Sequence, residues 1–292
     1  MKISRTYLVL LLGMILWGLY PIFTHRFVLS LDPIFLVSIS TLTASIPFFL
    51  LLAAKKELNQ FFSVKYLKTF LGVAFFTAAG QGLLFIGTKL TSGTNTGLLL
   101  QVEPIYSLIL GIIFLGEILN GSQIGATILM VVGAVTIVYK GGVSINSGDI
   151  LILFSPLMFQ LSHLIGKRLL NKNIDVNLIL ASRQFYGGLM LLLFTFFTNK
   201  SAITLFNGRS ISIGLSLGLF TAIVALCWYS SIKKVPVSVA SSFIPITALV
   251  SLVGSAFFLK EVISIQQYLG FFFIVGGMLW QASSSKIIER AE

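Results

Sequence analysis

Residues 98–111, LLLQVEPIYSLILG, place an acid and a proline in the middle of an apolar run. Glu103 lies near the centre of this run, between Gln101 and Pro104. A carboxylate at the centre of a bilayer is costly unless it faces protein, water or a partner, or stays protonated. Pro104 has no amide hydrogen and disturbs the turn before it, which frees carbonyl groups for a cavity. Glu103 is therefore a candidate for binding a proton or a substrate amine, and the alternative is a neutral acid in a helix contact.

Two further ionisable side chains, Arg183 and His163, lie in apolar runs. Arg183 follows ILAS and precedes QFYGG, close to the end of its run. It has three interpretations: reaching the interface, binding a substrate carboxylate or phosphate, or pairing with Glu103. His163 in FQLSHLIGK titrates near neutrality and is a candidate for a proton relay or for a structural contact. By contrast, His25 is placed in a loop flank.

Amide and aromatic side chains complete the candidate binding residues. An amide inside an apolar run bonds either a substrate or a neighbouring helix. Tyr and Trp stack on rings and cations, but they also favour the membrane interface. The candidates are Gln81, Gln101, Gln160, Trp17, Tyr20, Tyr106, Tyr186, Trp228 and Tyr229. Trp17 and Tyr20 are three residues apart and share a helix face. Proline disturbs a helix, and the predicted bend points are Pro21, Pro104, Pro156 and Pro245.

The composition favours a membrane protein. Of the 292 residues, 56% are hydrophobic and 10% are charged, whereas soluble domains contain about 25% charged residues. The net charge of +11 does not indicate nucleic-acid binding, because the Lys and Arg residues cluster in short gaps between apolar runs. The single cysteine, Cys227, excludes an intrachain disulfide.

The apolar runs predict ten transmembrane helices and an all-α, polytopic membrane protein. A helix needs about 20 apolar residues to cross the hydrocarbon core. The runs are too long and lack the alternation of barrel strands. The first run continues without a cleavage site, so it is interpreted as a retained span rather than a signal peptide. The ten predicted spans are 6–25, 33–54, 67–87, 92–116, 121–140, 148–167, 177–197, 210–231, 236–259 and 265–283.

The basic residues predict the orientation. With a cytoplasmic N-terminus, the inner segments hold 13 of the 20 basic residues and the outer segments hold six. The inner ones are Lys2, Arg5, Lys55, Lys56, Lys65, Lys68, Lys167, Arg168, Lys172, Lys233, Lys234, Lys286 and Arg290, and the outer ones are Arg26, Lys89, Lys140, Lys200, Arg209 and Lys260. We therefore expect both termini in the cytoplasm and a multi-pass protein of the inner (cytoplasmic) membrane.

The two halves of the chain repeat each other. Lys89 and Lys233 are 144 residues apart, as are Glu117 and Glu261. Five helices per copy predict two inverted repeats, residues 1–143 and 144–292, an architecture common in secondary transporters. Glu117 and Glu261 occupy corresponding helix ends, where structural roles in hydrogen-bonding the turn are expected.

The motifs WGLYPI, PIYSLILGIIFLGE and, in the second half, IPITALVSLVGSAFFLKE resemble the EamA-type branch of the drug/metabolite transporter superfamily. The resemblance covers nearly the whole chain. It implies ten helices in two inverted repeats, a central cavity, and transport of small organic metabolites, often outward. The chain departs from the family pattern in two ways. Its second span, LVSISTLTASIPFF, lacks an expected arginine, and Pro104 to Glu117 is 13 residues whereas Pro245 to Glu261 is 16.

The function expected from the sequence is alternating-access secondary transport of a small polar or amphipathic metabolite, with amino acids and related amines as the leading class and proton-coupled export as the mode. One alternative is an obligate exchanger for an anionic or nucleotide-like substrate, and a distant one is an intramembrane lipid-modifying enzyme. Walker, HExxH and CxxC motifs are absent, so no enzyme activity, metal or cofactor is expected. The expected partners are a small-molecule substrate, membrane lipids and protons, without nucleic acid, for a monomer or homodimer.

Overall fold

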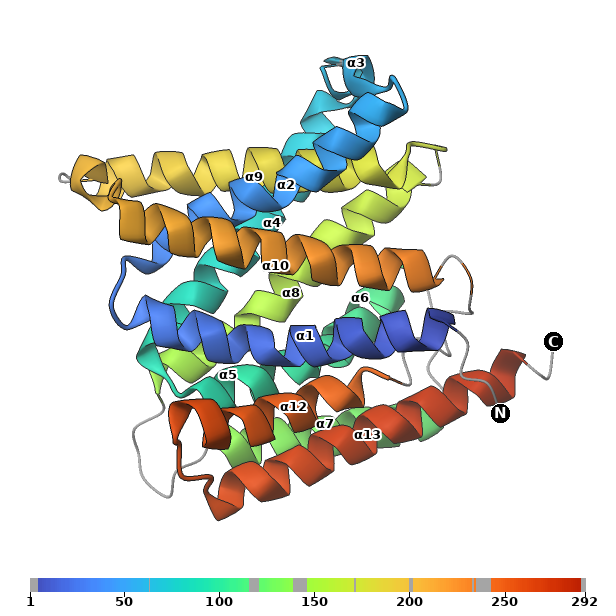
Figure 1. Ribbon diagram of the computed structural model, residues 1–292. Helices are drawn as coiled ribbons and strands as arrows, with labels where there is room; N and C mark the ends of the chain where they lie inside the picture. The colour runs from blue at the N-terminus through green and yellow to red at the C-terminus, as the bar shows by residue number, and fades with distance from the viewer. Residues whose placement is uncertain are drawn as a thin grey trace. The chain divides into compact units, whose positions relative to one another are not determined.

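A computed structural model describes residues 5–62, 64–115, 121–138, 146–170, 172–199, 202–232, 234 and 243–289. These residues form helices joined by short turns (Figure 1). The long helices are α1 (Arg5–Val28), α2 (Pro33–Ala54), α4 (Val64–Leu90), α6 (Glu103–Leu115), α7 (Gly121–Val138), α8 (Ser147–Leu170), α9 (Val176–Thr198), α10 (Gly208–Ile232), α12 (Pro245–Gly254) and α13 (Ile265–Glu289). The short elements are α3 (Leu58–Phe61), α5 (Gly93–Leu99), the 3-10 turns Leu100–Val102 and Ala202–Leu205, and the π turn Ser255–Leu259.

Within the described residues, eight segments are long and apolar enough to cross a membrane. They are Arg5–Val28, Pro33–Ala54, Lys65–Leu90, Gly93–Phe114, Gly121–Val138, Ser147–Leu170, Val176–Thr198 and Gly208–Trp228. Each overlaps one of the first eight predicted spans. The segment Pro245–Leu259 is apolar but shorter, and the start of its predicted span, 236–242, lies outside the described residues. The chain is thus an all-helical, multi-pass membrane protein over its described part, and ten spans stay a prediction.

Capping residues determine where several helices begin. Asp32 caps α2 by accepting a hydrogen bond from the Phe35 amide at 2.8 Å, and Pro33 supplies a helical φ at the first position. Asp175 caps α9 in the same way through the Asn177 amide, at 2.7 Å. These caps follow from local sequence, because each side chain bonds a donor two or three residues ahead.

The chain divides into two compact units, and each draws segments from both halves of the sequence. Unit 1 comprises Met1–Arg26, Gly87–Leu153 and Ile223–Glu292. Unit 2 comprises Phe27–Ile86 and Phe154–Ala222. Helices α1, α4, α8 and α10 therefore each contribute to both units. The predicted repeats, residues 1–143 and 144–292, divide the chain by sequence similarity. The compact units divide it by contacts, so their boundaries do not coincide with residue 143.

Unit 1 contains a closely packed helix pair, α7 with α13 (Figure 1). Small residues permit the close approach: a Cβ on Gly133 would lie 2.8 Å from Ile274 Cγ1, and one on Gly277 would lie 2.8 Å from the Ala126 carbonyl oxygen. Trp280 on α13 also donates a hydrogen bond to Ser122 on α7, at 2.7 Å. Glycine at such positions lets helix backbones approach and gain dispersion contacts.

Unit 2 contains the corresponding pair α2 and α9, again closed over small residues. A Cβ on Gly188 of α9 would lie 2.7 Å from the Leu42 amide of α2. At one end of the pair, the ammonium of Lys55 lies 2.6 Å from the Asp175 carboxylate. Helices α4 and α8 pack beside each other in the same unit through hydroxyl contacts, of which Ser155 to the Gly80 carbonyl, at 2.9 Å, is one.

Candidate functional site

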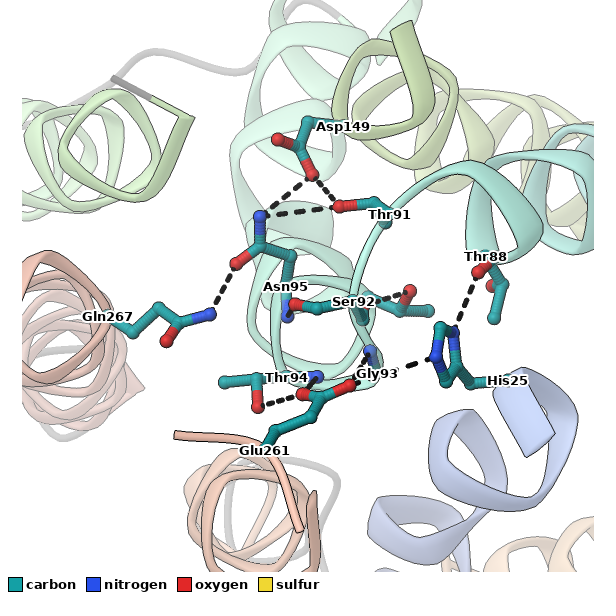
Figure 2. Close-up of polar contacts among 11 residues, drawn as sticks. His25, Thr88, Thr91, Ser92, Gly93, Thr94, Asn95, Asp149, Glu261 and Gln267 are labelled. Carbon is teal, nitrogen blue, oxygen red and sulfur yellow. Dashed lines mark hydrogen bonds and ion pairs between the residues drawn. The ribbon is translucent and has the colours of Figure 1, made fainter. Parts of the chain in front are cut away.

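A cluster of polar side chains surrounds the start of α5 in unit 1 (Figure 2). We call it the α5 network. Its members come from the ends of five separate helices and the turns beside them. They are His25, Thr88, Thr91, Ser92, Gly93, Thr94, Asn95, Asp149, Glu261 and Gln267.

Local sequence begins α5 immediately after α4. Ser92 takes an extended conformation as the N-cap, and its hydroxyl accepts a hydrogen bond from the Asn95 amide at 3.0 Å. Serine is among the preferred N-cap residues. At the next position, a Cβ on Gly93 would collide with the Leu259 side chain. The glycine leaves room for the Leu259 side chain, which reaches the α5 backbone from the π turn before α13.

Glu261 satisfies the amides at the start of α5 from a distant part of the chain. One carboxylate oxygen accepts from the Gly93 amide at 2.8 Å. The other accepts from the Thr94 amide at 2.9 Å and from the Thr94 hydroxyl at 2.6 Å. The first amides of a helix have no partner inside it and carry partial positive charge, so a carboxylate is well suited to this place. Glu261 thus connects the segment between α12 and α13 to α5.

Asp149 connects α8 to the same turn. It lies in the first turn of α8 and is completely buried. One of its oxygens accepts hydrogen bonds from the Thr91 hydroxyl and from the Asn95 amide nitrogen, the latter at 2.9 Å. These hydrogen bonds offset part of the cost of burying the polar side chain.

Gln267 extends the network to α13. Its backbone and side chain form a reciprocal capping pair with Ser264: the Ser264 amide donates to Gln267 Oε1 at 2.8 Å, and the Gln267 amide donates to Ser264 Oγ at 3.2 Å. The amide nitrogen of the Gln267 side chain then donates to Asn95 Oδ1 at 2.8 Å. Asn95 therefore accepts a hydrogen bond from Gln267 of α13 and donates one to Asp149 of α8.

His25 links the network to α1. Its Nδ1 lies 2.9 Å from the Thr88 carbonyl oxygen, and because a carbonyl only accepts, Nδ1 carries the hydrogen. Its Nε2 lies 3.8 Å from a carboxylate oxygen of Glu261. The placement of His25 in a loop flank was wrong, since α1 continues through it to Val28. The helix extends because no proline or glycine interrupts residues 22–28.

Sequence reasoning did not select the α5 network as a site. Its members stand at the ends of apolar runs, where polar residues are ordinarily solvent-facing. The signals available were the SGTN stretch between two spans and an acid near each of two other helix ends, Asp149 and Glu261. Pairing them needs long-range contacts, with 168 residues separating Gly93 from Glu261.

Residues 93–115 form a helix with a 3-10 turn near its middle, and we call this segment the interrupted helix. Helix α5 ends at Leu99, a 3-10 turn follows over Leu100–Val102, and α6 begins at Glu103. Glu103 is partly buried at this junction, and its own amide bonds the Leu100 carbonyl. Such a break changes the direction and pairing of backbone carbonyls in the middle of a span.

Gln101 and Thr247 connect the interrupted helix to α12. The side-chain nitrogen of Gln101 donates to the Gly97 carbonyl at 3.1 Å, and its oxygen accepts from the Thr247 hydroxyl at 2.9 Å. One turn along α12, the Ser251 hydroxyl donates to the Gly18 carbonyl of α1 at 2.8 Å. Gln101 is buried and serves a helix contact here, which is one of the two roles expected for it.

The other sequence-selected residues of unit 1 lie on α1, α6 and α10. Trp17 and Tyr20 stack with ring centroids 5.2 Å apart, so they do share a face, and Tyr20 is buried. Trp228 packs against Leu10 and Met14 of α1. The remaining residues are Tyr106, which is partly buried on α6, and Tyr229, which lies on α10.

Five sequence-selected residues belong to unit 2, and the structure brings two of them together. Arg183 on α9 lies with Nη1 2.9 Å from Nε2 of His163 on α8. Arginine only donates, so this His163 nitrogen accepts. Tyr186 stacks on Phe61 with centroids 5.1 Å apart. The other two residues, Gln81 on α4 and Gln160 on α8, are both partly buried.

The candidate bend points occupy three kinds of position. Pro21 and Pro156 lie inside α1 and α8. Pro104 is the second residue of α6, and Pro245 is the first residue of α12. Proline at the first turn of a helix costs little, because the amide there has no helical partner.

The Lys55–Asp175 pair has shifted protonation equilibria. The hydrogen bond from Lys55 to Asp175 raises the pKa of the Lys55 ammonium above 10.5. Burial by itself would raise the pKa of the Asp175 carboxyl, but the hydrogen bonds from Lys55 and Asn177 outweigh it and hold the pKa below 3.8. Both shifts favour the charged forms, so the pair is ionic at neutral pH.

Fold and residue placement define a multi-pass helical membrane protein with a buried polar network and an interrupted helix. The EamA-like transporter family model matches this chain twice, over residues 4–139 and 146–281. The chain belongs to the EamA-like transporter family, which confirms the resemblance found in its motifs.

Two proteins of Bacillus subtilis (strain 168), both named as uncharacterized transporters, are similar to this chain. YyaM is 24% identical over 211 residues, covering 68% of this chain and 67% of YyaM. YetK is 26% identical over 226 residues, covering 74% of this chain and 66% of YetK. The matched part thus spans about two thirds of each relative. A protein crystal structure also shares the fold, with a TM-score of 0.68 and 12% identity over 97% of this chain and 99% of that one.

Proposed function

We propose that this protein is a secondary transporter that moves a small polar or amphipathic metabolite, with an amino acid or related amine as substrate. The observation that carries the proposal is the interrupted helix with an acid at its break. Glu103 begins α6 where α5 and the 3-10 turn end, within the candidate span Gly93–Phe114. A 3-10 turn within a helix often marks a functional hinge, and irregular helices near the midplane form substrate and ion sites in secondary transporters.

Family membership supports the transporter class. Both halves of the chain match the same family model, which fits two inverted five-helix repeats and ten spans. The proposed placement is the cytoplasmic membrane with both termini inside, based on the excess of basic residues in the inner segments. Alternating access around a site near the repeat interface follows from this architecture.

In this mechanism, Glu103 binds either the substrate ammonium or a proton, and the two compete. Export then follows when the proton gradient drives the exchange of one for the other. The proposal makes Glu103 the coupling residue because it is an acid at the helix break, where it is only partly buried.

Reconstitution in liposomes tests the proposal. Uptake of a labelled amino-acid and nucleoside panel is measured with and without a pH gradient, for wild type, Glu103→Gln and the control Glu57→Gln, whose acid lies between α2 and α3. We expect one substrate class to move, and only Glu103→Gln to abolish the response to the gradient. A Glu103→Gln protein that behaves as wild type would assign the acid a structural role. A wild type that moves no member of the panel would remove the proposed substrate class.

A second candidate is an obligate exchanger of anionic substrates, favoured by the Arg183–His163 contact. An arginine inside a span is suited to a substrate carboxylate or phosphate. Transport that is independent of a pH gradient, is strongly stimulated by internal substrate and is lost in Arg183→Gln would select this candidate over proton-coupled export.

A further inference from the structure

A basic cavity opens between α4 and α8 at one end of unit 2. Three cations line it: Lys68 on α4, Arg168 in the last turn of α8, and Lys172, two residues after the end of α8. The remaining lining residues are Thr69, Gly72, Ile165 and Leu169, and the cavity has a volume of about 400 Å³. None of the lining residues is acidic.

The cavity exists because α4 and α8 separate there. Further along, the Ser162 hydroxyl donates to the Val73 carbonyl at 2.9 Å and lies 2.8 Å from the Thr77 hydroxyl. A Cβ on Gly80 would lie 2.7 Å from the Phe159 ring, whereas one on Gly72 would meet only Ile165, at 3.8 Å. The helices are therefore in close contact from residue 73 onwards and open around Gly72.

The cavity lies at the ends of two candidate membrane spans, which is where the boundary with the lipid headgroups is expected. Lys68 lies in the first turn of the candidate span Lys65–Leu90, and Arg168 in the last turn of Ser147–Leu170. Ile165, nearly one turn from Arg168 towards the middle of the span, is half-buried and provides an apolar wall on the side of the hydrocarbon core. A phospholipid has the complementary arrangement, with a charged phosphate group next to apolar acyl chains.

The acids at this end of unit 2 do not neutralise the cavity. Asp175 is engaged by Lys55, at 2.6 Å, and Glu57 does not line the cavity. Lys68, Arg168 and Lys172 are all exposed, as an anion-binding site requires. A cation excess at cytoplasmic span ends is ordinary, but three cations converging on one cavity between two helices is a more specific arrangement.

We propose that the cavity between α4 and α8 binds the phosphate of an anionic phospholipid headgroup. The phosphate oxygens accept hydrogen bonds from the Arg168 guanidinium and the two lysine ammonium groups. The acyl chains lie along Ile165. The site is separate from Glu103 and from the α5 network, and it does not depend on the proposed substrate or coupling.

The test compares lipid binding by wild type with that of two variants of equal charge change. The first, Lys68→Gln/Arg168→Gln/Lys172→Gln, removes the cavity cations. The matched control, Arg26→Gln/Lys89→Gln/Lys260→Gln, removes three exposed cations that do not line the cavity. Each purified protein is placed in nanodiscs of phosphatidylcholine alone, or of equal parts phosphatidylcholine and phosphatidylglycerol. The bound phosphatidylglycerol is measured by native mass spectrometry, and the thermal midpoint is recorded.

We expect wild type and the control to retain phosphatidylglycerol and to gain thermal stability from it, while the cavity variant does neither. Affinity should fall about fivefold for each cation removed, which corresponds to ~1 kcal/mol per basic residue at an anionic surface. Equal losses in both variants would overturn the proposal in favour of general surface charge. Equal stabilisation of wild type by glycerol 1-phosphate without lipid would overturn it in favour of a soluble phosphate site. Equal thermal midpoints of the variants in phosphatidylcholine confirm that both fold.

Discussion

Removing the Glu261 carboxylate should detach the start of α5 from the segment between α12 and α13. In Glu261→Ala, the buried amides of Gly93 and Thr94 lose their partner. An unsatisfied buried amide costs about 1–3 kcal/mol. The Glu261 side chain is 18% exposed, so water reaches part of the site and the total loss is reduced. We expect the free energy of unfolding to fall by about 2–4 kcal/mol in Glu261→Ala. The decrease should be about 1–2 kcal/mol in Glu261→Gln, because glutamine keeps one acceptor oxygen.

The global readout is the midpoint of reversible unfolding in mixed micelles, and the local readout is hydrogen exchange at the Gly93 and Thr94 amides. Local exchange in Glu261→Ala should rise at least about tenfold, as expected for more than ~1.4 kcal/mol of lost local stability. Lys260→Gln is the control, because its side chain is exposed beside Glu261. Unchanged exchange at both amides in Glu261→Ala would refute the capping role, even if global stability fell.

Three further outcomes are expected. Asp175→Ala should lower the free energy of unfolding by about 1–2 kcal/mol, because it removes the α9 cap and the ion pair. Asp175→Asn keeps a capping oxygen, so thermal denaturation should show a decrease of at most about 1 kcal/mol. Because the pKa of Asp175 is lowered, the ion pair's contribution to stability is present above pH 3.8 and is lost as the pH falls through the lower pKa of the folded protein. The free energies of unfolding of wild type and Asp175→Asn should therefore become equal in acid. Because the pKa of Lys55 is raised, the same contribution to stability is present below pH 10.5 and is lost as the pH rises through the higher pKa of the folded protein. If wild type remained more stable than Lys55→Gln above that pKa, the result would contradict the pairing. Gly97→Ala should lower the free energy of unfolding by about 1–3 kcal/mol, because the added Cβ overpacks against Ser251. The control Gly121→Ala, with nothing within 4 Å of its Cβ, should leave the stability unchanged or slightly raised in the same assay.

The helices themselves could be predicted from the sequence. An apolar run of about 20 residues has few ways to satisfy its backbone in lipid, and a helix is the local one. Caps such as Asp32 and Ser92 are equally local, because the side chain bonds an amide three residues ahead. The shared helix face of Trp17 and Tyr20 followed from helical spacing in the same way, and in the structure their rings stack.

The interrupted helix could be predicted in part. Glu103 and Pro104 marked an irregular place within a span, and the structure has a 3-10 turn directly before them. Proline acts on the turn that precedes it, so this effect is also local. The partner of Gln101 was not predictable, since Thr247 is 146 residues away and any hydroxyl in an apolar helix would have served equally.

The amino-acid sequence is sufficient to assign the class of protein. The length and hydrophobicity of the apolar runs, with basic residues in the gaps, indicate a multi-pass membrane protein, and the motifs in both halves resemble the EamA-like transporter family, to which the chain belongs. Which helix ends meet is known only from the three-dimensional packing. Glu261 had looked like a turn residue, yet its carboxylate lies on the amides of a helix that begins 168 residues earlier. Hydrophobic periodicity identifies the residues that leave water, but it carries no information about which buried donor meets which acceptor, because that pairing is set by the packing of whole helices.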